Sequence, residues 1–310
     1  MSTMPNAESP SSRLLSLSPG IRAMAIGAWW FAIMGLLVKV AGRRLPSSQI
    51  VLVRATLTLA MSYWAVRQAG LPSIWGRQRW LLLTRGALGA IGINCFYYSL
   101  VHLPLGDATL IQYTNPIFAT VVAALWVGER VRPGEMLCLG TALAGVVLIT
   151  RPGFLFGAAA AAYAQRDVAI ALFGAICSGA AYAAVRKMGS TEHRSVVVFY
   201  LPLVTFPAAV PFATATWLTP TPTEWMLLIG VAGATQLAQV YMTRGLQAES
   251  AVRATTTGYL QIVFAIAWGV LLLGERPSLW TLAGAVIIVG SALVLAFGHR
   301  PGVVSIASVR

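Results

Sequence analysis

Residues 100–130 read LVHLPLGDATLIQYTNPIFATVVAALWVGER, and residues 246–276 read LQAESAVRATTTGYLQIVFAIAWGVLLLGER. The second stretch follows the first at a shift of 146 positions, and ten of the 31 aligned positions are identical. The identical residues of the first stretch are Leu100, Ala108, Thr109, Tyr113, Phe118, Ala119, Leu125, Gly128, Glu129 and Arg130. Two apolar segments share some residues by coincidence, but coincidence does not explain a Gly-Glu-Arg triplet at the same place in both. The sequence therefore predicts two related halves.

A second alignment extends the repeat toward the beginning of each half. At a shift of 147, three residues of the first half meet identical residues of the second: Gly27, Ala28 and Gly42 meet Gly174, Ala175 and Gly189. If each half crosses a membrane an odd number of times, the two halves insert with opposite orientations. Inverted repeats of this kind place a substrate site near the middle of the membrane, between the halves.

The composition places this repeat in a membrane. Apolar residues make up 57% of the 310 residues and charged residues 10%, whereas a soluble domain is about a quarter charged. With a mean hydropathy of +0.75, the chain has too little polar surface to cover a globule in water. A soluble enzyme, a disordered protein and a nucleic-acid-binding domain are therefore excluded as first interpretations. The net charge of +13 comes from short basic runs between apolar segments, which is typical of membrane loops facing anionic lipid.

Ten apolar segments are each long enough, or nearly so, to cross a bilayer as a helix. They cover approximately residues 21–41, 48–66, 80–101, 107–127, 134–150, 167–185, 195–217, 224–243, 251–273 and 278–297. Loops rich in Lys and Arg alternate along the chain with loops that have few of them. Because cytoplasmic loops carry the excess of Lys and Arg, this pattern predicts that both termini lie in the cytoplasm. We therefore expect an all-α membrane protein with ten transmembrane helices, arranged as two inverted five-helix repeats.

This organisation divides the chain into five parts. We expect a flexible cytoplasmic tail over residues 1–20, which lacks the apolar core of a signal peptide. The first repeat covers residues 21–151 and the second covers residues 166–297, with an external linker at 152–165 and a cytoplasmic tail at 298–310. The three cysteines, Cys95, Cys138 and Cys177, lie in apolar segments without metal-ligand spacing, so we expect no disulfide, metal or cofactor.

The end of the first half contains Tyr97-Tyr98-Ser99-Leu100, Gly106-Asp107-Ala108, Asn115-Pro116-Ile117-Phe118 and Gly128-Glu129-Arg130. The second half has Ser250-Ala251 and Gly274-Glu275-Arg276. In these motifs the chain resembles the EamA-type ten-span members of the drug/metabolite transporter superfamily, although Ile262 replaces the usual proline. The resemblance covers about residues 21–297 and implies a secondary carrier for small organic metabolites, often an exporter, with amino acids well represented among its substrates.

Polar residues near the middle of the expected fourth span are the first candidates for substrate binding. Gln112, Tyr113 and Asn115 precede or adjoin Pro116, which lacks a backbone donor and so frees the carbonyl of residue 112. Lipid cannot satisfy polar groups at that depth, so a cavity wall suits them. The alternative is that these side chains hold neighbouring helices together. Tyr259 aligns with Tyr113 and would line the same cavity, unless it is a packed aromatic residue with a satisfied hydroxyl.

Two polar stripes and one tryptophan complete the predicted substrate site. Gln239 and Thr243 follow one face of the expected eighth span, and Asn94, Tyr97 and Tyr98 follow one face of the third. Trp30, beside Trp29, lies well inside the first span, where it could stack on a substrate or pack in the core.

Charged residues supply the gating and structural candidates. Arg54 lies about two turns into the second span and matches the family; it could attract a carboxylate or bind carbonyl groups near the helix end. Arg85 is expected to snorkel to the cytoplasmic face. The pairs Glu129-Arg130 and Glu275-Arg276 end the fourth and ninth spans, and with Pro116 we interpret them as structural or gating elements rather than substrate ligands.

These features predict a bacterial inner-membrane exporter, not an enzyme, that moves small amphipathic metabolites such as neutral or aromatic amino acids by alternating access. None of the nine acidic residues lies mid-span, so we expect no proton carrier of the carboxylate type, with His102 as the alternative titrating group, and no catalytic residues. The expected partners are a small-molecule substrate and the bilayer, without nucleic acid, in a monomer or homodimer. A sugar-phosphate or nucleotide-sugar carrier would need two cavity cations, and an intramembrane enzyme would need a convergent acid, base or metal set.

Overall fold

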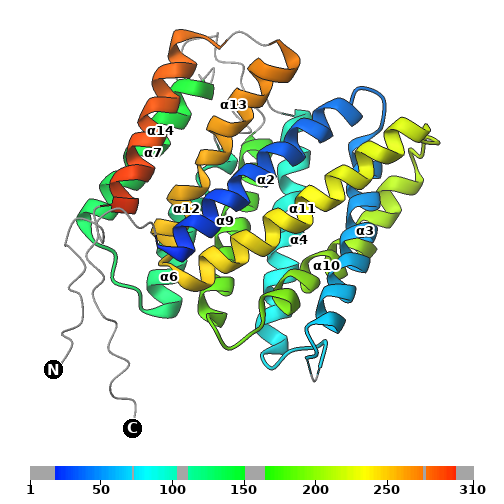
Figure 1. Cartoon of the computed structure of the whole chain (residues 1–310), viewed down its shortest axis with the longest axis horizontal. Coiled ribbons are helices and arrows are strands. Elements are labelled where there is room, and N and C mark those ends of the chain that lie inside the picture. Colours follow the sequence, from blue (N-terminus) through cyan, green and yellow to red (C-terminus); the bar gives the residue numbers. More distant parts are fainter. Residues whose placement is uncertain (1–17, 72, 103–110, 151–164, 275–276, 298–310) are drawn as a thin grey trace, which may run out of the picture.

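The computed structural model describes residues 18–71, 73–102, 111–150, 165–274 and 277–297. This part of the chain forms α-helices and contains no strand, so the all-α prediction is confirmed there (Figure 1). In the first half the helices are α2 (Pro19–Ala41), α3 (Ser47–Gln68), α4 (Arg79–His102), α6 (Asn115–Val127) and α7 (Pro133–Thr150). In the second half they are α9 (Gln165–Met188), α10 (Arg194–Thr214), α11 (Pro222–Ala248), α12 (Ala251–Gly258), α13 (Leu260–Leu273) and α14 (Leu279–Phe297).

Six helical stretches are long and apolar enough to cross a bilayer, judged by length and composition within the described residues. They are α2, α3, α9, α10, α11 and the stretch Ala251–Leu272 of α12 and α13. Three shorter apolar helices accompany them, at Asn115–Val127, Pro133–Ile149 and Leu279–Val294. The outer surface carries large apolar side chains such as Leu125 and Leu279, each more than four-fifths exposed, as a lipid-facing surface would. The total of ten spans and the side on which the termini lie remain predictions.

Helices of one half pack mainly against helices of the other. The most extensive contacts join α2 to α11, α4 to α9, α3 to α10, α7 to α14 and α6 to α9. Under the repeat alignment α2 corresponds to α9 and α11 to α4, so the first two of these contacts are equivalent. In Figure 1 the pair α7 and α14 lies at one end of the molecule, and the pair α3 and α10 lies toward the other.

Equivalent glycines allow the equivalent helices to approach each other. A Cβ atom on Gly27 of α2 would lie 3.1 Å from the backbone nitrogen of Met242 in α11. A Cβ atom on Gly174 of α9 would lie 2.5 Å from Cβ of Cys95 in α4. Because neither position has room for a side chain, the two helix pairs come into backbone contact, as small residues permit between membrane helices.

Two spans that the sequence predicts to be continuous are broken, and this is a correction to the predicted helices. Within the first half, residues 111 and 112 are helical, Tyr113 and Thr114 form a turn, and α6 begins at Asn115. In the second half, Tyr259 separates α12 from α13. Tyr113 and Tyr259 are aligned by the repeat, so both halves are interrupted at the same place.

The glycine of each Gly-Glu-Arg triplet ends the helix that follows the break. Gly128 caps α6 with φ of 75°, and Gly274 caps α13 with φ of 65°. Both values lie in the left-handed region, which glycine adopts without the steric penalty of a Cβ atom. The repeated triplet therefore marks the point where the chain turns out of each helix.

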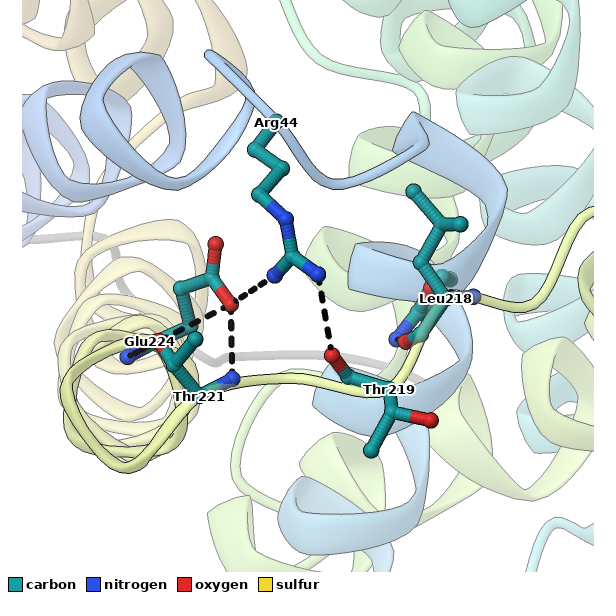
Figure 2. Close-up of polar contacts among 6 residues, drawn as sticks. Arg44, Leu218, Thr219, Thr221 and Glu224 are labelled. Atoms are coloured by element: carbon teal, nitrogen blue, oxygen red, sulfur yellow. Dashed lines mark hydrogen bonds and ion pairs between the residues drawn. The ribbon is translucent and has the colours of Figure 1, made fainter.

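Two sets of polar contacts join loops of the two halves at opposite ends of α3. The first, which we call the Arg44 clasp, connects the loop after α2 to the segment before α11 (Figure 2). Arg44 donates to Glu224 (Nη1 to Oε2, 2.5 Å) and to the carbonyl of Thr219 (3.3 Å). The amide of Gln49 donates to the carbonyl of Leu218 (2.6 Å) and accepts from its backbone nitrogen (3.0 Å).

The second set, which we call the Glu192 clasp, connects the loop between α9 and α10 to the loop before α4. The carboxylate of Glu192 accepts from the backbone nitrogen of Arg77 (2.7 Å) and from that of Gln78. Its backbone carbonyl accepts from the side-chain amide of Gln247 near the end of α11 (3.0 Å). Under the repeat alignment this loop pair is the counterpart of the loop pair in the Arg44 clasp.

Candidate substrate cavity

A cavity of about 220 Å³ lies between the halves, beside the break at Tyr113. Its walls come from α2, α3, α4, α9, α10 and α11, from residues on either side of the first break, and from Gln261, which follows the second break. Aromatic and aliphatic residues form the apolar part: Phe31, Met34, Ile93, Phe96, Tyr182, Leu201 and Met242. Polar residues interrupt this surface at a few places. Such a mixture is typical of small-molecule sites.

Four of the predicted substrate residues lie on this cavity: Gln112, Tyr113, Asn115 and Gln239. The amide nitrogen of Gln112 donates to Oγ of Ser178 in α9 (3.3 Å), while its Oε1 is buried with no hydrogen-bond partner among the described residues. That oxygen is therefore an unsatisfied acceptor in the wall of the cavity that Gln112 lines.

Tyr259 lies next to this site, on a smaller cavity of about 50 Å³ that shares several walls with the large one and that Pro116 also lines. Its side chain is only 1% exposed, and its hydroxyl donates to the backbone carbonyl of Tyr113 (2.6 Å). The centroids of the two tyrosine rings lie 5.9 Å apart. Tyr259 thus packs against the ring of Tyr113, and its hydrogen bond joins the two breaks directly.

The remaining predicted substrate residues are not among the residues that line either cavity. Tyr98 donates to Oδ1 of Asp167 at the start of α9 (2.9 Å), and exposed Asn94 bonds the carbonyl of Ala90 in its own helix (2.8 Å). Thr243 is completely buried, and Trp30 is half-buried beside the cavity-lining Phe31. The side chain of Tyr97 lies outside the described residues.

Arg85 is the main cavity residue that the sequence interpretation missed. The prediction that it snorkels is wrong, because its side chain is only 3% exposed and its Nη2 donates to Oε1 of Gln239 (3.0 Å). Its other two nitrogens, Nε and Nη1, are buried without a partner in the described part of the chain. The signal was available: Arg85, Gly89, Ile93 and Phe96 recur at helical spacing on one face of α4, and all four line the cavity.

Arg54 places a second positive charge on the same cavity. It lies on α3, where its Nε is buried and has no partner among the described residues. No acidic residue is among those that line the cavity, and the six acids that the structure describes all bond elsewhere. Their partners are Arg186 for Glu129, the Arg132 backbone for Glu135, Tyr98 for Asp167, the loop before α4 for Glu192, Arg44 for Glu224, and Arg253 for Glu249.

The predicted gating pair of the first half lies away from the cavity. The carboxylate of Glu129 pairs with Arg186 at the end of α9 and accepts from the backbone nitrogen of Ala251, the first residue of α12 (3.0 Å). Arg186 also donates to the carbonyl of Gln247 (3.2 Å). Arg130 is exposed. The corresponding Glu275 and Arg276 lie outside the described residues.

Metal binding has no visible ligand set in this part of the chain. The residues that the structure describes contain no group of three or more His, Cys, Asp or Glu side chains that could hold an ion. The three cysteines are free thiols, and two of them are buried.

Comparison with known proteins identifies the family. The model of the EamA-like transporter family matches residues 18–151 and 166–297. The pseudopaline exporter CntI of Pseudomonas aeruginosa (strain UCBPP-PA14) is 32% identical over 281 residues, covering 90% of this chain and 96% of that protein. The S-adenosylmethionine uptake transporter of Rickettsia bellii is 24% identical over 302 residues, covering 92% and 98%.

A solved crystal structure has the same fold, with a TM-score of 0.75 at 18% identity, covering 91% of this chain and 97% of that one. The family match spans most of the sequence, and the named relatives are transporters in both directions. The chain is thus a membrane transporter that belongs to the EamA-like transporter family, within the drug/metabolite transporter superfamily.

Proposed function

We propose that this protein is a secondary transporter that exports small amphipathic metabolites carrying a carboxylate, with amino acids among them. The cavity between the halves carries the proposal, because it combines aromatic walls with the amides of Gln112, Asn115 and Gln239 and with two arginines. Aromatic and aliphatic walls suit the hydrocarbon part of such a molecule, and amide and guanidinium groups suit its polar end. The exporter among the relatives supports the direction.

Alternating access would use the two clasps as gates. The Arg44 clasp and the Glu192 clasp hold loops of opposite halves together at the two ends of α3. Opening one of them while the other stays closed would expose the cavity to one side only, as rocking between inverted repeats requires. With no acidic residue on the described cavity wall, we infer exchange or facilitated diffusion driven by the substrate gradient.

A sugar-phosphate or nucleotide-sugar carrier is the second candidate. Such a carrier needs two cavity cations, and the pattern of residues alone indicated one suitably placed cation, Arg54. Arg85 supplies the second cation at the cavity. Phosphorylated substrates therefore belong in the same assay as amino acids.

Counterflow in proteoliposomes tests the proposal. Vesicles containing the purified protein are loaded with one unlabelled compound, and entry of the labelled compound is followed for phenylalanine, threonine, glutamate and glucose 6-phosphate. We expect protein-dependent accumulation of at least one carboxylate, reduced about tenfold or more by Gln239→Ala and unchanged by Gln68→Ala. Gln68 is the matched control because it is an exposed glutamine at the end of α3, away from the cavity.

Two results would contradict the proposal. If the folded protein accumulates none of the four compounds, it is not a carrier of these amino acids or of the sugar phosphate. Transport that requires an imposed pH gradient would refute the exchange mechanism and direct attention to His102.

A further inference from the structure

We propose that Arg54 and Arg85 form an anion subsite that makes the cavity selective for organic acids with two negatively charged groups over neutral zwitterions. The inference rests on the proposed function and narrows its substrate class. It concerns the charge of the substrate, which neither the fold nor the family fixes.

The state of Arg85 is the first observation. Its guanidinium group is almost completely buried and retains two donor nitrogens without a partner among the described residues, and its one hydrogen bond goes to a neutral amide. A buried charge without a counter-charge is costly in any protein interior. Gly89, one turn along α4, lines the cavity together with Arg85, and a Cβ atom there would lie 2.9 Å from Cδ1 of Leu201 and 3.5 Å from Nη1 of Arg85. Arg85 is therefore a cavity-lining cation whose two unpaired nitrogens are buried within the cavity wall.

Arg54 and Gln239 complete a set of donors. Arg54 lines the same cavity from α3 and also borders a small adjoining space that Gln239 lines. Because Oε1 of Gln239 is occupied by Arg85, its amide nitrogen remains to donate to a ligand. Two guanidinium groups and an amide from three different helices thus surround one volume.

The two arginines without a counter-charge determine the charge that a ligand should carry. The six described acids are engaged elsewhere, so the protein supplies no anion to either arginine among the residues described here. A neutral amino acid carries one carboxylate, which leaves one arginine without a counter-charge and adds an ammonium group near it. A molecule with two carboxylates, or with a carboxylate and a phosphate, neutralises both. The orphaned Oε1 of Gln112 would then accept from one N–H or O–H group on the same molecule.

Matched ligand pairs test the charge preference on the unmodified full-length protein. The pairs are glutamate with glutamine, and phenylsuccinate with phenylalanine, each member similar in size and different in charge. O-phosphoserine distinguishes a phosphate from a second carboxylate. Both thermal stabilisation in detergent and inhibition of counterflow are measured. We expect the acidic member of at least one pair to bind about tenfold or more tightly than its neutral partner. Equal binding, or preference for the neutral member in both pairs, would overturn the inference.

Variants separate substrate recognition from a structural role. Arg85→Gln and Arg54→Gln should each weaken binding of the acidic member by roughly thirtyfold or more, because truncating one partner of a buried charge pair costs that much. Binding of the neutral member should change much less. Arg85→Lys should keep part of the preference for the acid. Arg79→Gln is the matched control, since Arg79 is an exposed arginine at the start of the same helix.

The outcomes distinguish the inference from the function on which it rests. If neutral members exchange across the membrane and acidic members do not, the transporter proposal stands and the anion subsite is wrong. If the variants reduce binding of both members equally, the arginines are structural and the inference is also wrong. If no compound of either charge exchanges with folded wild-type protein, both proposals fail.

Discussion

The breaks at Tyr113 and Tyr259 occupy equivalent positions in the two halves, yet only the first is followed by a proline. Pro116 lies three residues after Tyr113, and Ile262 lies three residues after Tyr259. Ile262 keeps its backbone donor and bonds the carbonyl of Tyr259 (3.0 Å), a tight turn of the 3₁₀ type. Because the second helix breaks without a proline, the break belongs to the repeated architecture and not to one residue.

The same comparison explains the contact between the breaks. Pro116 has no N–H group, and the backbone nitrogen of Ile117 bonds Thr114 instead (2.9 Å), so the carbonyl of Tyr113 lacks the local donor that Tyr259 has. The hydroxyl of Tyr259 supplies it (2.6 Å). A donor lost in the first half is thus replaced from the second half, and this hydrogen bond couples the halves next to the cavity.

The largest expected effect comes from the glycine of α9 that packs against α6, the helix that follows the first break. Gly179 in α9 aligns with Ala32 in α2, and a Cβ atom on Gly179 would lie 2.7 Å from the carbonyl oxygen of Asn115 and 2.7 Å from the nitrogen of Ala119. Backbone cannot yield as a side chain can, so Gly179→Leu should lower the free energy of unfolding by about 3 kcal/mol. Ala32→Gly should cost about 1 kcal/mol. Titration with a denaturing detergent measures both, and a loss no larger for Gly179→Leu than for Ala32→Gly would mean that the backbone of α6 yields to the added side chain.

The next largest effect is a difference in stability between variants that lack the hydroxyl of Tyr259 and variants that lack the hydroxyl of Tyr113. Tyr259→Phe leaves the buried carbonyl of Tyr113 without its donor and should cost about 1–3 kcal/mol of stability. Tyr113→Phe is the matched control, because the hydroxyl of Tyr113 makes no hydrogen bond to the described residues, and its stability should change by less than about 0.5 kcal/mol. Similar losses in both variants would show that the hydroxyl of Tyr259 contributes nothing specific.

The helix caps should respond alike, in contrast to the tyrosines. Gly128→Ala and Gly274→Ala each place a Cβ atom on a residue with left-handed φ, at a cost of about 1 kcal/mol. Among the residues that the structure describes, no atom lies within 4 Å of the position where a Cβ would be added to either glycine, so backbone conformation is the cause being tested. The melting temperatures of the two variants in detergent should fall by similar amounts, and a fall in only one would show that the caps are not equivalent.

The sequence predicted the helical class and the family, because the repeated Gly-Glu-Arg triplet and the long apolar segments are local signals. It also placed Gln112, Tyr113, Asn115 and Gln239 near one another through periodicity and the repeat, although their role in binding remains a prediction. The break at Tyr259 was not predictable from a proline signal, since Ile262 occupies that position.

Arg85 is buried because another helix covers it, which its depth along α4 alone does not reveal. In the folded protein α10 lies directly on this part of α4: a Cβ atom on Gly86 would meet the carbonyl oxygen of Tyr200 at 2.7 Å. The guanidinium group is therefore enclosed and bonds Gln239. Tyr98 shows the opposite error, because its position in a polar stripe did not reveal that Asp167 of the other half lies within hydrogen-bond distance. Both errors concern contacts between halves, which no segment of sequence contains by itself.

The smallest effect is a coupling energy, and it tests the exchange of donors between the halves. Pro116→Ala restores an N–H group at the position from which Ile262 bonds Tyr259, so the restored N–H group can bond the carbonyl of Tyr113 in the same way. The break itself should persist, as it does in the second half without a proline. In the Pro116→Ala background, Tyr259→Phe should therefore cost less than it does alone, with a coupling of about 0.5–1 kcal/mol in the double-mutant cycle. If Tyr259→Phe costs the same with proline or alanine at position 116, the hydroxyl does not stand in for the missing backbone donor.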